Sequence, residues 1–192
     1  MSTGLDCQTP QGRIHIAQQH AVIAACCAEW RCESVVTDDT QDSPIDVLFS
    51  GAGVLLAVAE VKCRPTLTRQ QLRAFKEPGY LITHRKVREG VQIAKQLRVP
   101  YYVIVGMSDV VAWWKVSDAA GALAFDIRSV RTATQATCNG GKAFRLNAFL
   151  PLRDMHTLRY AEPLPMALDG DMTDDASPSP SSMVSAEEMR WS

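Results

Sequence analysis

The sequence lacks any long apolar run. The stretch from Ala52 to Ala59 is far shorter than the ~20 residues that a membrane helix needs. The first residues, Met1 to Asp6, also lack the basic and apolar segments of a secretory signal. We therefore expect a cytoplasmic protein without a membrane partner.

Cysteine pairs with metal-ligand spacing are also missing. The chain has six cysteines, but none forms a Cys-x-x-Cys pair and no Cys/His spacing matches a structural zinc site. Cys26 and Cys27 lie in an apolar helical run, where a free cysteine behaves as a small hydrophobic residue. This usage favours a reducing compartment over a disulfide framework.

Net charge is nearly absent, at −1, but the charges are unevenly placed. Residues 1–160 hold 19 Lys and Arg against 14 Asp and Glu, whereas residues 161–192 hold 1 against 7. Within residues 62–98 the count is 10 basic to 2 acidic, which is typical of a surface that holds a polyanion. A pair of solvated helix faces is the alternative explanation.

The composition predicts one folded domain, residues 1–160, followed by an acidic, Pro/Ser-rich disordered tail, residues 161–192. Hydrophobic periodicity predicts the elements of the domain. The expected helices are 14–30, about 66–77 and 84–97, with a helical turn at 154–160. The expected strands are 33–37, 43–49, 54–62, 101–105, 110–116, 122–127 and 144–149.

One predicted β-hairpin carries charged residues in an unusual place. Residues i and i+2 of a strand share a face, so Glu60 and Lys62 point one way while Val61 packs on the other side. Hairpin pairing brings Asp46, near the start of the preceding strand, across from them. Two carboxylates beside a Lys suit Mg²⁺, which takes one or two protein carboxylates and fills its other positions with water and phosphate oxygens. A structural ion pair at a sheet end is the alternative.

With these residues the chain resembles the PD-(D/E)XK nuclease superfamily. Pro44-Ile45-Asp46 matches the "PD" of the motif with one residue inserted, and Glu60-Val61-Lys62 matches its "ExK". The resemblance covers about residues 14–116. It implies an α/β fold with a restriction-endonuclease-like core, a central mixed β-sheet flanked by helices in the order α-β-β-β-α-β.

The resemblance also implies roles for individual residues. Asp46 and Glu60 would ligate Mg²⁺, with the Val61 carbonyl completing the metal shell, and Mn²⁺ is expected to support activity too. Lys62 would help activate the attacking water and stabilise charge on the phosphate. Gln71 matches a glutamine that many relatives carry in the helix after this strand. The chain departs from several relatives in its first helix, where Gln18 or Gln19 stands in place of a glutamate.

These features lead us to expect a Mg²⁺-dependent nuclease that hydrolyses phosphodiester bonds, most readily those of DNA. The residues expected to contact nucleic acid are Arg64, Arg69, Arg73, Lys76, Arg85 and Lys86. A catalytically weak or inactive nucleic-acid-binding or interaction module on the same fold is the alternative. The sequence is compatible with a homo-oligomer and with a protein partner that binds the acidic tail. If a virus encodes the chain, its place is the host-cell cytoplasm.

Overall fold

The computed structural model describes residues 10–38, 43–74, 79–133 and 144–158, without the side chains of residues 10, 11 and 133. The expected tail, residues 161–192, lies outside these ranges. The helices are α1 (Pro10–Trp30), α2 (Arg69–Ala74) and α3 (His84–Leu97), with a short 3₁₀ helix at Leu152–Asp154. The strands are β1 (Glu33–Val36), β2 (Val47–Gly51), β3 (Val54–Arg64), β4 (Gly79–Thr83), β5 (Tyr101–Met107), β6 (Val111–Ser117), β7 (Arg128–Ala133), β8 (Phe144–Pro151) and β9 (His156–Thr157).

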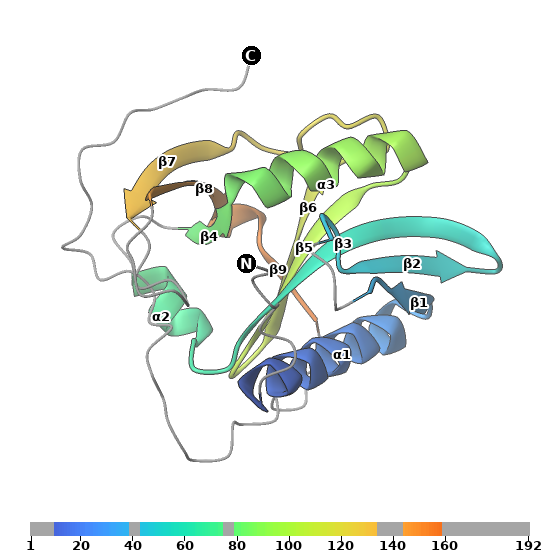
Figure 1. The fold of residues 1–192 in the computed structure, drawn as a ribbon, viewed down its shortest axis with the longest axis horizontal. Coiled ribbons are helices and arrows are strands. Elements are labelled where there is room, and N and C mark those ends of the chain that lie inside the picture. Colours follow the sequence, from blue (N-terminus) through green and yellow to red (C-terminus); the bar gives the residue numbers. More distant parts are fainter. Residues whose placement is uncertain (1–9, 39–42, 75–78, 134–143, 159–192) are drawn as a thin grey trace, which may run out of the picture.

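A mixed six-stranded sheet, in the order β1-β2-β3-β5-β6-β9, forms the centre of the fold. Strands β3 and β5 are parallel, and every other neighbouring pair is antiparallel. Helix α1 lies on one face of this sheet and α3 on the other (Figure 1). The expected central mixed sheet flanked by helices is therefore confirmed.

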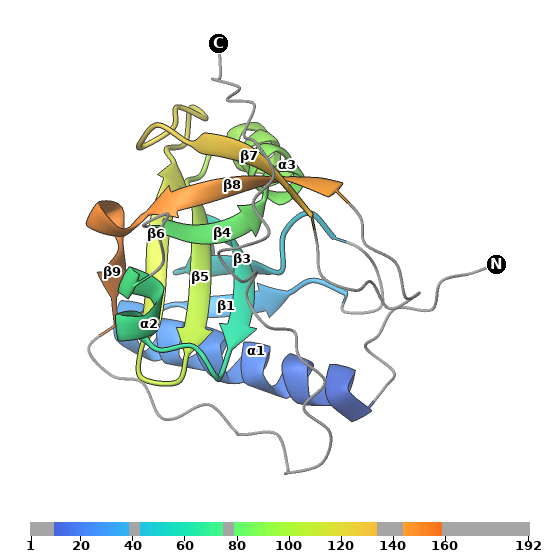
Figure 2. The same cartoon turned by 90° about the vertical axis from the view of Figure 1, so that its left-hand side faces the viewer.

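A smaller antiparallel sheet, in the order β4-β8-β7, crosses the central sheet on the side opposite α1 (Figure 2). Tyr80 of β4 and Leu150 of β8 are buried in the same core as Val103 and Trp114 of the central sheet. The indole N–H of Trp114 donates to the Pro151 carbonyl at 2.9 Å. The small sheet and α3 thus cover this face together.

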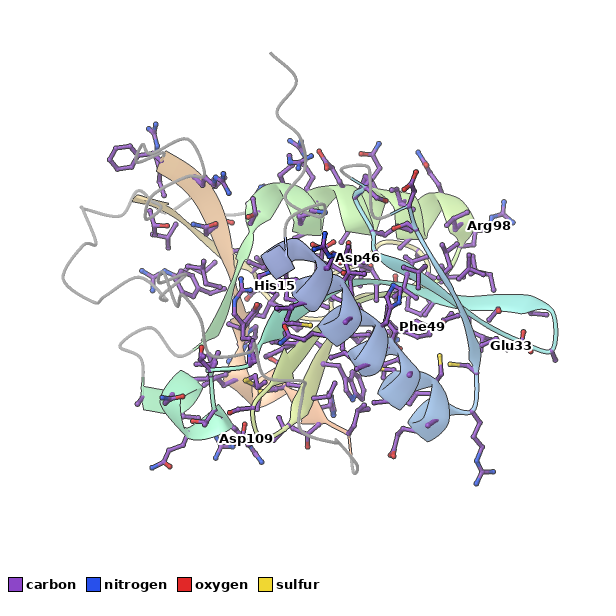
Figure 3. The ribbon with its side chains drawn as sticks, turned by 60° about the horizontal axis from the view of Figure 1, so that its bottom comes forward. His15, Glu33, Asp46, Phe49, Arg98 and Asp109 are labelled. Atoms are coloured by element: carbon purple, nitrogen blue, oxygen red, sulfur yellow. The ribbon has the colours of Figure 1, made fainter. Side chains whose placement is uncertain are left out.

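Helix α1 closes the opposite face with a separate apolar core. Its buried Val22 and Ile23 pack in the cluster that contains Phe49 of β2 and Val61 of β3. Figure 3, which looks at the molecule from the α1 side, shows Phe49 next to the helix. The ring of Trp30 meets Phe49 edge-on, with 5.3 Å between ring centroids.

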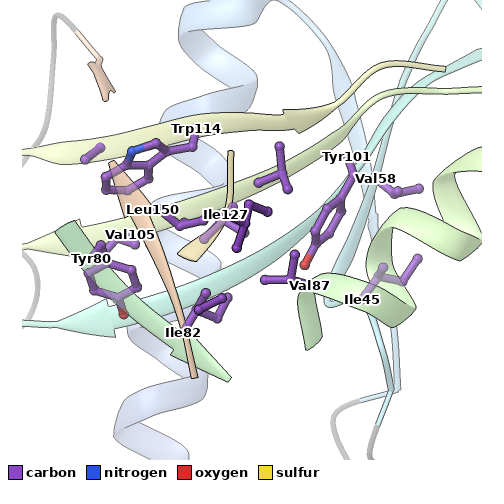
Figure 4. Close-up of a cluster of buried hydrophobic side chains, with 14 of the residues drawn as sticks. Ile45, Val58, Tyr80, Ile82, Val87, Tyr101, Val105, Trp114, Ile127 and Leu150 are labelled. Carbon is purple, nitrogen blue, oxygen red and sulfur yellow. The ribbon is translucent and has the colours of Figure 1, made fainter. Parts of the chain in front are cut away.

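Helix α3 carries a glycine, Gly90, where the ring of Tyr101 from β5 packs against it. A Cβ at Gly90 would lie 2.3 Å from Cζ of Tyr101, far inside van der Waals contact. Tyr101 is fully buried and its ring points toward α3 beside Val87 (Figure 4). Its hydroxyl donates to the carbonyl of Lys86 at 3.3 Å, which fixes the first turns of α3 against the sheet.

Four local predictions were wrong. Residues 79–83 form β4 and residues 128–133 form β7, where no strand was expected, and residues 156–157 form β9 instead of part of a helical turn. Residues 122–127 are not a strand, although an isolated bridge joins Ser117 and Leu123. The Asp118 carboxylate accepts hydrogen bonds from the N–H groups of Ala120 and Ala122, so the chain turns there instead of extending.

No helix among the described residues is long and apolar enough to span a membrane.

Candidate functional site

Asp46 is held in place by backbone hydrogen bonds on both sides. Its N–H donates to the Ala59 carbonyl and its own carbonyl accepts from the N–H of Thr37, both at 2.9 Å. The side chain then reaches across the hairpin, where Oδ2 accepts the N–H of Val61 at 2.7 Å. Asp46 thus lies directly beside the Glu-Val-Lys segment of β3, as the hairpin predicts.

The alternation of β3 separates its charged residues from the apolar one between them. Val61 is buried in the α1-side core, whereas Glu60 and Lys62 point to the α3 side. The Lys62 ammonium lies 2.5 Å from Glu60 Oε1, and Lys62 is about one-third exposed while Glu60 is fully buried. The site therefore has a buried carboxylate at its base and an accessible ammonium at its opening.

A second ammonium, which the motif does not include, reaches Glu60 from α3. Lys86 Nζ lies 3.3 Å from Glu60 Oε2, and its side chain is 15% exposed. The same Nζ donates to the Ser43 carbonyl at 2.5 Å. One lysine therefore connects α3 both to Glu60 and to the segment that leads into Asp46.

The electrostatic environment of Glu60 shifts two pKa values. Burial raises the pKa of Glu60 above its ordinary value, and Asp46 raises it further, against the opposing effects of Lys62 and Lys86. Burial acts to lower the pKa of Lys62, but Glu60 and Asp46 outweigh it and the net shift is upward. Lys62 is therefore a fixed positive charge at neutral pH.

A basic cleft of about 730 Å³ opens beside this cluster. It lies between the end of β3, the end of β4 and first turns of α3, and the start of β8. Its lining residues are Lys62, Arg64, Ile82, Thr83, His84, Arg85, Lys86, Arg88, Arg145 and Leu146. Of the predicted contact residues, the structure thus gathers Arg64, Arg85 and Lys86 around Lys62.

Other predicted site residues lie on or near α2. The Gln71 side chain accepts the Thr68 N–H at 2.7 Å while Thr68 Oγ1 accepts the Gln71 N–H at 3.1 Å, a reciprocal cap of this short helix. The Arg69 N–H donates to the Asp109 carboxylate at 3.0 Å. Neither these residues nor Arg73 lines the basic cleft. Lys76 lies outside the described residues.

Arg145 is a cleft residue that the sequence analysis missed. It lies near the start of β8, which pairs with β4 and β7. Neither of these two strands was expected from the sequence. In the first helix, Gln18 is 1% exposed on the face of α1 that packs against the sheet, whereas Gln19 is half-buried. The buried position expected for the missing glutamate is thus held by a neutral amide.

The donor set fits a hard divalent cation. Two carboxylates and a backbone carbonyl of one hairpin are oxygen donors of the kind that Mg²⁺ prefers. Both Glu60 oxygens are buried, and among the described residues they receive no well-directed hydrogen bond; they face two ammonium groups. No group of three or more His, Cys, Asp or Glu side chains placed to hold a metal ion occurs within the described ranges.

The fold and this carboxylate–lysine cluster define the PD-(D/E)XK class of nucleases. A family model described as "Phage putative PDDEXK endonuclease" matches residues 16–139, which is more than half of the chain and includes Asp46, Glu60 and Lys62. The chain belongs to this family of phage endonucleases. The expected superfamily and its restriction-endonuclease-like fold class are therefore confirmed.

Two further comparisons add little. No curated protein matches the chain. Among solved structures, the chain is similar to Hjc, a Holliday junction resolvase of Archaeoglobus fulgidus, with 14% sequence identity and a TM-score of 0.36. The match covers 49% of this chain and 74% of the resolvase. A likeness of this size carries no argument about substrate, so the assignment rests on the family and on the site.

Proposed function

We propose that this protein is a Mg²⁺-dependent nuclease that hydrolyses phosphodiester bonds of DNA. The observation that carries the proposal is a fully buried Glu60, next to Asp46, that pairs with two lysines, Lys62 and Lys86, of a cleft lined by cationic side chains. Burying a carboxylate is costly unless a cation binds it, and a cleft of Lys and Arg suits an anionic polymer. Nuclease chemistry uses both features together.

Each residue of the cluster has a distinct task. Asp46 and Glu60 would hold the divalent ion, with the Val61 carbonyl as a third donor, and the ion would supply a hydroxide nucleophile and neutralise phosphate oxygens. Lys62, one-third exposed at the cleft, would orient the attacking water and stabilise charge developing on the phosphate. Arg64, Arg85, Arg88 and Arg145 would hold the flanking phosphates.

A catalytically weak binding module on the same fold is the second candidate. Two observations favour it: both Glu60 oxygens already face ammonium groups, and the first helix contributes the neutral Gln18 in place of a carboxylate. This candidate shares the cleft and the affinity for nucleic acid with the nuclease. It differs in predicting no metal-dependent turnover.

Incubation with labelled single-stranded, double-stranded and branched DNA, and with RNA, separates the two candidates. Each substrate is tested with Mg²⁺, with Mn²⁺ and with EDTA. We expect cleavage of DNA with either metal and none with EDTA. Asp46→Asn and Glu60→Gln should abolish cleavage, and the matched control Lys115→Met, an exposed lysine on β6, should not. Binding of every substrate without cleavage of any would favour the second candidate.

A further inference from the structure

Lys86 differs from Arg85 and Arg88 of the cleft because its ammonium, like that of Lys62, is engaged with buried Glu60. It contacts Glu60 Oε2 at 3.3 Å and the Ser43 carbonyl at 2.5 Å, with only 15% of the side chain exposed. Its own carbonyl accepts the hydrogen bond of the buried Tyr101 hydroxyl. The ammonium of Lys86 is thus held by Glu60 and Ser43, and its backbone carbonyl by Tyr101 of β5.

The neighbouring arginines provide the contrast. Arg85 and Arg88 line the same cleft with side chains that are 48% and 59% exposed, and both pair with Glu89 on the surface of α3. A phosphate contact needs an exposed cationic group whose counter-ion can be exchanged. The arginines meet this requirement, whereas Lys86 points inward.

We propose that Lys86 is an internal counter-ion of the carboxylate site: it holds Glu60 and the Ser43–Asp46 segment in the metal-free protein, and yields Glu60 Oε2 when a divalent cation binds. Lys86 is therefore a positioning residue and not a phosphate contact. This inference rests on the metal dependence proposed above. It explains how a fully buried carboxylate keeps its place without a metal ion.

The role has a cost for metal affinity. An ammonium 3.3 Å from a ligand oxygen repels a second cation and competes for the same electron pairs. Replacing Lys86 by a neutral residue should therefore increase the affinity for the metal ion, even though it lowers the stability of the metal-free protein. A lysine that merely held phosphate would give neither effect.

The first test measures Mn²⁺ affinity by isothermal titration calorimetry, without DNA. We expect Lys86→Met to bind Mn²⁺ at least about tenfold more tightly than the wild type. Lys86→Arg, which keeps the charge, and the matched cleft variant Arg88→Met should stay within about twofold. Unchanged or weaker binding by Lys86→Met would overturn the proposal.

The second test measures affinity for DNA in EDTA as a function of salt. Arg88→Met should reduce the slope of log affinity against log salt by about one, and Lys86→Met should leave the slope unchanged. If Lys86→Met reduces the slope as Arg88→Met does, the residue contacts phosphate and the proposal fails.

A double-mutant cycle on the free energy of unfolding covers the case in which Lys86→Met is poorly stable. The decrease that Lys86→Met causes in the folding equilibrium constant should be at least about tenfold smaller in a Glu60→Gln background. Additive effects would show that Lys86 does not act on Glu60. A wild-type protein without Mn²⁺ affinity but with strong coupling would contradict the proposed metal dependence instead, so the two failures are distinguishable.

Discussion

The two faces of β3 meet opposite environments within three residues. On the α1 side, Val61 lies in a core of Val, Ile, Phe and Ala side chains. On the α3 side, Glu60 and Lys62 face Lys86 and the basic cleft. The first face packs apolar side chains, whereas the second buries a carboxylate between two lysines.

The difference shows how an ordinary strand alternation produces a site. A buried ion pair is weak evidence for stability, because desolvation of the charges offsets most of their attraction. The chain nonetheless keeps Glu60 completely buried with Asp46 nearby. A buried carboxylate whose ion pairs contribute little to the stability of the protein is a reason to expect function, and the family assignment agrees.

The largest effect should come from the accessible charge on the α3 side. We expect Lys62→Met to lower the rate of DNA cleavage by about 10²–10³-fold, because a preorganised positive group would no longer stabilise the developing phosphate charge. Single-turnover kinetics measure the loss, and circular dichroism confirms that the variant is folded at the assay temperature. A folded variant with wild-type rates would remove Lys62 from the mechanism.

The contact between α3 and β5 should be the next most sensitive. Gly90→Ala places a methyl group against the buried Tyr101 ring, so the ring or α3, which carries Lys86, must shift. We expect the free energy of unfolding to fall by about 3 kcal/mol, the upper part of the range for overpacking. Urea denaturation measures this quantity. Gly51→Ala, whose added methyl would meet only the exposed Leu56 side chain, is the control.

On the α1 side, Val61→Ala should separate stability from chemistry. The smaller side chain leaves a cavity under α1 and should cost about 1–2 kcal/mol of unfolding free energy. Cleavage should stay within a few-fold of wild type, because Asp46 contacts the backbone N–H of Val61 and not its side chain. If Val61→Ala lost as much cleavage activity as Lys62→Met, the claim that only the α3-side face of β3 takes part in the chemistry would be contradicted.

The smallest predicted effect is a pH dependence of stability. Burial raises the pKa of Glu60 above 4.5, so the folded state retains its proton at pH values where the unfolded state has lost it. The free energy of unfolding of the wild type, relative to Glu60→Gln, should therefore decrease as pH rises through this interval. Urea titrations in EDTA at several pH values measure the difference. An increase with pH would mean that Lys62 and Lys86 outweigh burial.

The sequence was sufficient to predict the hairpin and its charged face. The apolar run of residues 54–59, the Glu-Val-Lys sequence that follows it, the turn before it and the carboxylate of the preceding predicted strand are all local features. These local features alone bring Asp46, Glu60 and Lys62 together. Gln71 is a different case: its place after the strand matched the superfamily, but in the structure its side chain caps α2.

Features that depend on distant partners could not be predicted. Strand β4 directly precedes α3, and its partner β8 begins about 60 residues later, so nothing local marks residues 79–83 as a strand. Arg145 reaches the cleft through this pairing. The sequence marks Lys86 only as one basic residue of a helix, because its ammonium comes to lie beside Glu60 through the packing of α3 on Tyr101.

Anomalous diffraction from crystals soaked in Mn²⁺ tests the central claim most directly. We expect a peak bounded by the Asp46 and Glu60 carboxylates and the Val61 carbonyl. Crystals of Glu60→Gln should lack the peak. A wild-type crystal in which Mn²⁺ is absent from this position, while Glu60 stays paired with Lys62 and Lys86, would contradict the claim that this face of β3 is a metal-dependent nuclease site.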